Sequence, residues 1–243
     1  MGLVEIDDGY DFRVVVADER WVFRFPRRPG VVPALETEVA LLPVIARALP
    51  VRVPHFELVS EDPPFVAYRL IDGEPLADED PAGVRAFLDA LHAIPIDTLP
   101  LETTDWVASY REQCAEFERA VLTLLPVELH TQAFDLFAEV ETLTGFTPSL
   151  VHADLGPEHL RVRGGRLAGV IDWGDARIGD PAIDYSWLLN GPFADWEVEP
   201  DLRRRARFYY RLGPWFEAHY GIFTGRTAHL DRGLAGIAER LVE

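Results

Sequence analysis

The stretch VHADLGPEHLRVRGGRLAGVIDWGDARIGDPAID, residues 151–184, decides the fold of this chain. An apolar strand leads into a loop that carries Asp154, and His159 follows five residues later. A hairpin then turns at Gly164 and Gly165, and Asp172 closes its second strand. We expect the side chains of Asp154, His159 and Asp172 to converge on one spot.

Two carboxylates beside an imidazole form a set of groups with definite chemistry. Oxygen and nitrogen ligands of this kind suit a divalent cation, and they leave Asp154 able to accept a proton from a hydroxyl group. Zinc is a poor match, because the His-x-Asp motif has no third spaced His or Cys. We expect His152 to orient the loop by hydrogen bonding, and Asp180 and Asp184 to be structural.

The segments around this stretch predict an α+β fold. Residues 3–70 read as a hairpin broken at Glu19 and Arg20, a helix interrupted by Pro43, and two further strands. After Gly73 the apolar residues recur at helical spacing, over 81–93, 105–124 and 128–143, and the chain from residue 182 is mainly helical. The switch in composition predicts an N-terminal nucleotide-binding lobe over residues 1–72 and a C-terminal catalytic and substrate-binding lobe over residues 73–243.

The segments HADLGPEH and IDWGDARIGDPAID resemble the catalytic and metal-binding loops of the aminoglycoside phosphotransferase family, antibiotic kinases with the protein-kinase fold. The family pattern is H-G-D-x-x-x-x-N, then I-D-W or I-D-F, then G-D-P-x-x-D. Here Ala153 replaces the Gly and His159 replaces the Asn, as in the 2″-aminoglycoside phosphotransferase branch. The resemblance implies a protein-kinase-like two-lobe fold, with a small β-rich N-terminal lobe and a larger, mainly helical C-terminal lobe.

The upstream sequence supports the same resemblance. In WVFRFPRRP, Arg24 stands where these enzymes carry the lysine that holds the α- and β-phosphates, and Glu38 matches the helix glutamate that pairs with it. FVAYRLIDGEPL resembles a strand and a hinge, which places Tyr68, Arg69 and Leu70 at the nucleobase. The chain departs from the pattern at Arg24 and at the loop DDGYDFR, which carries a single glycine.

The resemblance implies a small-molecule kinase that transfers the γ-phosphate of ATP or GTP to a hydroxyl group. Asp154 would orient and deprotonate that hydroxyl, His159 and Asp172 would hold Mg²⁺, and Arg24 braced by Glu38 would position the phosphates. The implied acceptor is an aminoglycoside antibiotic, and the implied role is antibiotic resistance. The acidic stretch NGPFADWEVEPD offers Asp195, Trp196, Glu197 and Glu199 for a cationic substrate. The alternatives are a metabolite or macrolide kinase of the same fold and a nucleotide-binding pseudokinase.

Composition limits the other function classes. The chain has 243 residues and a formal net charge of −18, with no lysine, which argues against nucleic-acid or membrane-surface partners. Cys114 is the single cysteine and excludes an intramolecular disulfide, and no segment is apolar enough to span a membrane. We therefore expect a cytoplasmic protein, monomeric, with a nucleotide and a small cationic molecule as partners.

Overall fold

A computed structural model of the chain describes residues 2–6 and 9–242. The contacts within the chain divide it into two compact units. Unit 1 comprises Met1–Glu102 and Ser149–Ile178, and unit 2 comprises Thr103–Pro148 and Gly179–Glu243. Unit 1 therefore contains both the expected nucleotide-binding lobe and the stretch that carries Asp154 and Asp172. The expected lobe boundary after residue 72 stays a prediction.

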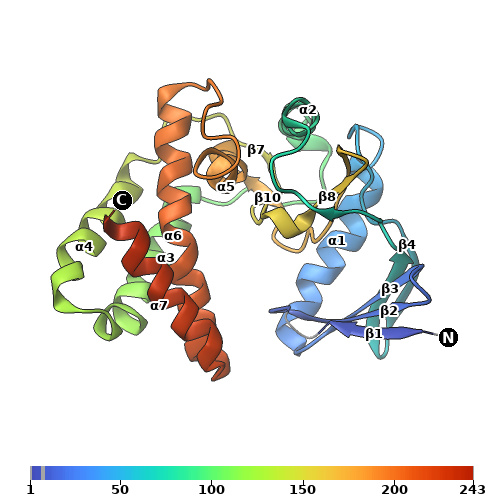
Figure 1. The fold of residues 1–243 in the computed structure, drawn as a ribbon, viewed down its shortest axis with the longest axis horizontal. Coiled ribbons are helices and arrows are strands. Elements are labelled where there is room, and N and C mark those ends of the chain that lie inside the picture. The colour runs from blue at the N-terminus through green and yellow to red at the C-terminus, as the bar shows by residue number, and fades with distance from the viewer. Residues whose placement is uncertain (1, 7–8, 243) are drawn as a thin grey trace. The chain divides into compact units, whose positions relative to one another are not determined.

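The first half of unit 1 is a five-stranded antiparallel sheet in the order β1-β2-β3-β5-β4 (Figure 1). Its strands are β1 (Leu3–Ile6), β2 (Phe12–Ala17), β3 (Trp21–Pro26), β4 (Phe56–Glu61) and β5 (Pro64–Arg69). The predicted hairpin is confirmed, because β2 pairs with β3 from Phe12 opposite Pro26 to Ala17 opposite Trp21. The register makes β3 a central strand, flanked by β2 and β5.

Alternation along β3 gives the sheet two different faces. Val22 and Arg24 are buried, whereas the aromatic rings of Phe23 and Phe25 stack on the other face at 6.5 Å. Helix α1 (Val32–Ile45) adds Leu35 to the core of this half, and it continues two residues past Pro43 instead of ending there. The buried positions of α1 include Glu38 at 0% exposure, so one carboxylate faces the interior of the unit.

The second half of unit 1 consists of short strands and one helix. These are β6 (Glu74–Pro75), α2 (Pro81–His92), β7 (Ser149–Val151), β8 (Leu160–Arg163), β9 (Arg166–Val170) and β10 (Arg177–Gly179). β6, β8 and β9 form one sheet, and β10 pairs with β7 in another. The predicted hairpin turn is confirmed, since Gly164 and Gly165 both have positive φ values, +60° and +73°. The two-residue strand β6 and the strand β10 were not predicted from the sequence.

Unit 2 is helical, with helices α3, α4, α5, α6 and α7 (Figure 1). Their bounds are α3 (Trp106–Ala120), α4 (His130–Ala138), α5 (Ser186–Leu189), α6 (Pro200–Thr224) and α7 (Thr227–Val242). A Cβ atom on Gly233 would lie 2.3 Å from the backbone nitrogen of Ala218, so glycine is required where α7 crosses α6. Short 3-10 turns replace the ends of the helices predicted over 105–124 and 128–143.

A buried ionic network holds the start of unit 2's second segment. Asp180 is 0% exposed, and its Oδ2 atom accepts hydrogen bonds from Nε of Arg205 at 2.7 Å and from the hydroxyl of Tyr209 at 3.0 Å. The same Tyr209 hydroxyl accepts a bond from Nε1 of Trp106 at 2.7 Å. A buried carboxylate needs such partners to offset its desolvation, and this arrangement agrees with the structural role expected for Asp180.

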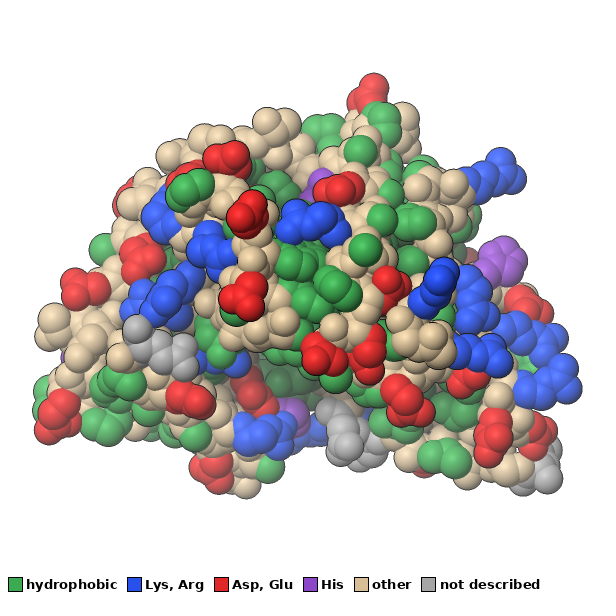
Figure 2. All heavy atoms as spheres, turned by 45° about the horizontal axis from the view of Figure 1, so that its top comes forward, with side chains coloured by type: hydrophobic (Ala, Val, Ile, Leu, Met, Phe, Trp, Pro, Cys, Tyr) green, Lys and Arg blue, Asp and Glu red, His purple; other side chains and the backbone are tan. Residues whose placement is uncertain are grey.

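The surface is charged on the face that Figure 2 shows, where acidic side chains are interspersed with arginines and apolar residues. Within the described part of the chain, none of the helices combines the length and the apolar character that crossing a bilayer requires.

Candidate active site

Two loops of unit 1 bring the predicted residues together. Asp154 lies on the loop after β7, His159 ends a 3-10 turn over Pro157–His159, and Asp172 follows β9. The backbone nitrogen of Ile171 donates to the carbonyl of His159 at 3.0 Å, which ties the second loop to the first. Residues far apart in the sequence therefore share one site because the β8–β9 hairpin returns the chain to its starting point.

His159 lies between the two aspartates. Its Nδ1 atom is 2.6 Å from the carbonyl oxygen of Asp154 and 3.6 Å from the Oδ2 atom of the same residue. On the other side of the ring, Nε2 is 3.7 Å from Oδ2 of Asp172. The predicted convergence of these three side chains is thus present in the geometry.

His152 fixes the two loops to each other. Its Nδ1 atom accepts the backbone N–H of Asp154 at 3.4 Å, so Nε2 carries the proton and donates to the carbonyl of Ile171 at 3.0 Å. The ring also packs edge-on against Trp173 at 4.7 Å and is fully buried. These contacts match the orienting role that the sequence predicts for His152.

Both loops hold a non-glycine residue in the left-handed region. Ala153 has φ of +67° and Asp172 has φ of +64°. This conformation costs an L-residue about 1–2 kcal/mol, although aspartate tolerates it better than alanine. The cost at Ala153 gives a physical reason for the glycine that the family pattern carries at this position, and it turns the Asp154 side chain out of the strand direction.

Arg24 connects the sheet to the second loop. One terminal nitrogen of its guanidinium donates to Oε2 of Glu38 at 2.6 Å, and the other donates to Oδ1 of Asp172 at 2.6 Å. The guanidinium also lies 4.0 Å from the centre of the Phe12 ring. Arg24 is 3% exposed, so the cation is held from three sides in the interior of unit 1. The contact with Phe12 was not predicted from the sequence.

The charges of this group are strongly coupled. Burial would lower the pKa of Arg24, but Glu38 and Asp172 outweigh it and hold that pKa above the ordinary arginine value. Burial raises the pKa of Glu38, and Arg24 offsets this only in part. Burial would also raise the pKa of Asp172, but Arg24 and His159 hold it below its ordinary value. Asp172 is therefore anionic at neutral pH.

The pKa of Asp154 is shifted in the opposite direction from that of Asp172. Burial by the surrounding protein raises its pKa to about 6, with Asp175 and Asp172 adding to the rise and His159 opposing it. The side chain keeps 57% of its surface accessible, so solvent screens part of these charges. Burial would lower the pKa of His159, but Asp154 and Asp172 raise it above the ordinary value. A carboxylate with a pKa moved toward neutrality suits a general base.

The pair of His159 and Asp172 fits a magnesium ion that a nucleotide helps to hold. Their facing atoms, Nε2 and Oδ2, are 3.7 Å apart. Adjacent ligands of an octahedral Mg²⁺ are about 3.0 Å apart, so the two side chains would have to approach each other by less than about 1 Å to share the ion. No group of three or more His, Cys, Asp or Glu side chains in the described ranges is arranged as a closed metal site. Two protein donors suit an ion whose remaining ligands are water and phosphate.

The predicted nucleobase residues lie at the end of β5. Tyr68 is paired on both sides, with Val22 of β3 and Phe56 of β4, and the backbone nitrogen of Leu70 donates to the carbonyl of Arg20 at 2.9 Å. After β5, the carbonyl of Leu70 and the main-chain groups of Ile71 and Asp72 have no main-chain partner among the described residues. The placement of the nucleobase at Tyr68, Arg69 and Leu70 stays a prediction.

Arg69 and Tyr68 point their side chains in different directions. Arg69 lies on the exposed face, where its guanidinium sits 3.8 Å from the centre of the Trp21 ring. The Tyr68 side chain is buried, with its ring 5.8 Å from that of Phe56, and burial raises its pKa. Of the two side chains, Tyr68 lies on the same face as Arg24.

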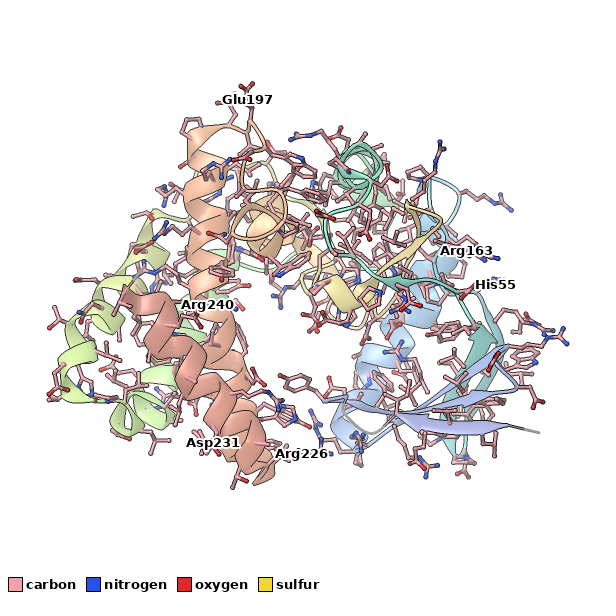
Figure 3. All side chains as sticks on the ribbon, in the orientation of Figure 1. His55, Arg163, Glu197, Arg226, Asp231 and Arg240 are labelled. Carbon is pink, nitrogen blue, oxygen red and sulfur yellow. The ribbon has the colours of Figure 1, made fainter. Side chains whose placement is uncertain are left out.

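The predicted substrate residues lie in unit 2, on the loop before α6. Asp195, Glu197 and Glu199 are exposed, and Figure 3 shows Glu197 pointing away from the ribbon. Trp196 is half-buried and stacks on Phe193 at 4.5 Å with an interplanar angle of 8°. The loop thus presents three carboxylates beside an aromatic pair.

Comparison with known proteins gives one family. Residues 2–219 match the sequence model of the phosphotransferase enzyme family. YcbJ of Bacillus subtilis (strain 168), an uncharacterized protein, is 26% identical over 206 residues, which cover 74% of this chain and 67% of that protein.

Solved structures with the same fold include other phosphotransferases. The GDP and kanamycin complex of APH(2″)-IIIa superposes with a TM-score of 0.87 at 25% identity, covering 99% of this chain and 93% of that one. A macrolide 2′-phosphotransferase from Brachybacterium faecium shares the fold with a TM-score of 0.71 at 24% identity, over 97% of this chain and 91% of that one. The predicted kinase-like α+β fold is confirmed. Since the family match spans most of the sequence, this chain belongs to the phosphotransferase enzyme family.

Proposed function

We propose that this phosphotransferase moves the γ-phosphate of ATP or GTP to a hydroxyl group of a small cationic molecule, an aminoglycoside. The observation that carries the proposal is the continuous cluster from Asp154 through His159 and Asp172 to Arg24 and Glu38. The cluster supports the proposal because groups suited to accept a proton, hold a metal and bind phosphate lie within one unit of the chain.

Each side chain has a role that its environment supports. Asp154 accepts the proton of the acceptor hydroxyl, because its raised pKa makes it a better base than an ordinary aspartate while leaving it largely ionised at neutral pH. His152 holds the Asp154 loop in position through its two hydrogen bonds to backbone groups. Orientation of the hydroxyl supplies much of the rate in reactions of this kind.

Arg24 and Asp172 would offset the negative charge of the phosphates, Arg24 through its own positive charge and Asp172 by helping to hold a cation. Asp172 and His159 would hold Mg²⁺, which would supply positive charge beside the transferred group. Arg24 is fixed by Glu38 and Phe12, so its guanidinium keeps one orientation toward anionic oxygens. Both terminal nitrogens of Arg24 are bonded to protein carboxylates, so Arg24 would act on the phosphates as a fixed positive charge, in place of the lysine that this chain lacks.

The nucleotide assignment draws on the structural neighbours and on the free backbone at the end of β5. Similar structures include complexes with GDP, with ADP and with ATP. The backbone of Ile71 and Asp72, next to the predicted residues Tyr68, Arg69 and Leu70, offers hydrogen-bonding groups to a purine edge. Both ATP and GTP remain candidates.

The acceptor assignment draws on charge. The chain has a net charge of −18, and its loop before α6 exposes Asp195, Glu197 and Glu199. Similar structures contain kanamycin, gentamicin and streptomycin. Ion pairs with carboxylates and contact with an aromatic pair suit an amino sugar better than a neutral sugar.

A turnover assay tests the proposal. Purified protein with Mg²⁺ and either ATP or GTP is offered kanamycin, gentamicin, a macrolide and a neutral disaccharide, and mass spectrometry follows the added phosphoryl group. We expect transfer to at least one aminoglycoside, loss of that transfer in Asp154→Asn, and full activity in Asp89→Asn, an exposed aspartate on α2. Transfer to the macrolide alone would favour the macrolide-kinase alternative. Absence of transfer to every acceptor would leave the pseudokinase alternative and refute the proposal.

A further inference from the structure

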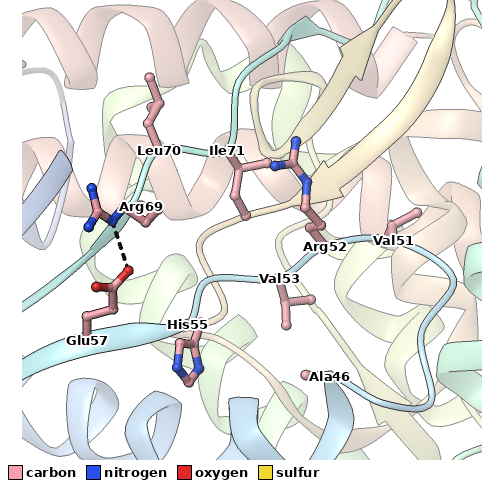
Figure 4. Close-up of a pocket in the computed structure, with 9 residues that line it drawn as sticks. All are labelled: Ala46, Val51, Arg52, Val53, His55, Glu57, Arg69, Leu70 and Ile71. Atoms are coloured by element: carbon pink, nitrogen blue, oxygen red, sulfur yellow. Dashed lines mark hydrogen bonds and ion pairs between the residues drawn. The ribbon is translucent and has the colours of Figure 1, made fainter. Parts of the chain in front are cut away.

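A hollow of about 410 Å³ lies in unit 1, away from the Asp154 cluster (Figure 4). Its walls come from the end of α1, from the segment that enters β4, and from the end of β5. The residues that define it in the following argument are Arg52, Val53, His55, Glu57, Arg69 and Ile71. We call it the β4–β5 pocket. Its volume falls in the range of pockets that hold small molecules.

The pocket carries more positive than negative side chains, although the chain is strongly acidic. Arg52 and Arg69 face one carboxylate, that of Glu57. The Nε atom of Arg69 donates to Oε1 of Glu57 at 3.0 Å, and the terminal nitrogens of Arg69 have no hydrogen-bond partner among the residues that the structure describes. The side chain of Arg52 likewise has no ion-pair or hydrogen-bond partner within the described ranges. Guanidinium donors at this pocket are therefore open to a ligand.

The guanidinium of Arg69 is held in place, whereas Arg52 is anchored by its backbone and its side chain is exposed. The guanidinium of Arg69 lies 3.8 Å from the centre of the Trp21 ring, which leaves it little rotational freedom. The backbone of Arg52 donates to the carbonyl of Ala168 at 3.2 Å and accepts from the nitrogen of Val170 at 2.9 Å. A cation whose position is already fixed loses less entropy when it binds an anion.

A second hollow of about 210 Å³ continues the pocket and is mostly apolar. It shares Ala46, Val53 and His55 with the β4–β5 pocket, and its further walls include Leu42 and Phe56. The two hollows together offer arginine side chains at one end and an apolar surface at the other. This surface suits a molecule with an anionic group and an apolar body.

We propose that the β4–β5 pocket binds a small molecule that carries a phosphate or a carboxylate on an apolar body. The two arginines hold the anionic group, and the surface around Val53 and Leu42 covers the apolar part. The site is distinct from the phosphotransfer cluster, because Arg24, Asp154 and Asp172 do not line it. The proposal does not depend on the identity of the acceptor or on turnover.

The pocket adjoins the backbone that we assign to the nucleobase. Arg69, Leu70 and Ile71 are among the residues that line the pocket, and the main-chain groups of Ile71 belong to the same short segment. The other side of Ile71 is closely packed, since a Cβ atom on Gly169 would lie 2.4 Å from Cγ2 of Ile71. A ligand in the pocket therefore contacts a segment with little room to shift.

Calorimetry and ligand-observed NMR with phenyl phosphate, benzoate and benzyl alcohol test the proposal. The titrations use the whole protein without Mg²⁺ and with saturating GDP, so that the nucleotide site is filled. We expect saturable binding of phenyl phosphate or benzoate, the stronger of the two identifying the anionic group, and at least about tenfold weaker binding of benzyl alcohol.

Three variants locate the binding. Arg52→Ala removes the unpaired guanidinium and is expected to weaken the anionic probes about tenfold or more. Ala46→Phe places a ring in the hollow and is expected to abolish binding, whereas Arg166→Ala, an exposed arginine of β9 outside the pocket, is expected to change nothing. Binding that GDP eliminates, or that Arg52→Ala and Arg166→Ala affect equally, overturns the proposal, as does the absence of saturable binding at millimolar probe.

Discussion

Replacing Arg24 with methionine should destabilise the protein in a way that depends on pH. Arg24 is 3% exposed, and its partner Glu38 is 0% exposed, so the substitution leaves a carboxylate in the interior without its cation. Removing one partner of such a pair costs about 3–5 kcal/mol, and loss of the contact with Phe12 adds about 0.5–2 kcal/mol. We expect the free energy of unfolding to fall by about 4 kcal/mol at pH 8, because Glu38 is more fully ionised there than at lower pH.

The sign of the pH effect follows from Glu38. Burial already raises its pKa in the wild type, and removing Arg24 raises it further above the unfolded value. The folded variant then binds a proton that the unfolded chain has released, so its stability falls as pH rises up to the folded pKa. Each pH unit in that window is worth about 1.4 kcal/mol. The deficit relative to wild type should therefore be smaller at pH 6 than at pH 8.

Urea unfolding at pH 6 and pH 8, followed by tryptophan fluorescence, measures both quantities. The double variant Arg24→Met/Glu38→Met removes the stranded charge and should regain most of the stability without regaining activity. Arg111→Met breaks an exposed pair with Glu141 and should change stability little. A single variant as stable as wild type, or a double variant no more stable than the single one, would refute the buried-pair argument.

Four further predictions follow, three from the candidate active site and one from the packing of β9. Asp154→Asn should lower kcat by at least ~10²-fold with little change in nucleotide affinity, and stopped assays with parallel GDP titrations separate the two. Asp172→Ala should remove the Mg²⁺ dependence of nucleotide binding, so calorimetry with and without Mg²⁺ should give equal affinities. In pH profiles, kcat/KM should rise with pH through about 6, because Asp154 must lose its proton to act as a base; a profile flat from pH 5 to 8 would contradict this. Gly169→Ala should destabilise by about 1–3 kcal/mol in thermal unfolding, because the new Cβ atom would lie 2.4 Å from Ile71.

Local patterns in the sequence carry much of the fold. The hairpin at Gly164 and Gly165 could be predicted because two adjacent residues with positive φ need glycine, and strand alternation marks its arms. The alternation around Arg24 likewise predicted a half-buried strand. The short strands β6 and β10 escaped prediction, since two or three residues show no periodicity and pair only because another strand lies alongside.

The sequence also predicted that Asp154, His159 and Asp172 lie together, because they flank a single hairpin. What only the tertiary structure decided is how residues from separate segments meet. Phe12 packs on the Arg24 guanidinium. Arg24 bonds to Glu38 of α1 and to Asp172, which lies 148 positions after Arg24 in the sequence. Side-chain reach and burial in a folded interior set these contacts, and no local pattern encodes them.

The same distinction applies to the end of β5. The resemblance of FVAYRLIDGEPL to a strand and a hinge placed the nucleobase near Tyr68, Arg69 and Leu70. In the assembled sheet Tyr68 is paired on both sides and the nitrogen of Leu70 is bonded to Arg20, whereas no main-chain bond to Ile71 or Asp72 is found among the described residues. A chain determines where its strands end, but which backbone groups stay free depends on the partners that tertiary pairing brings beside them.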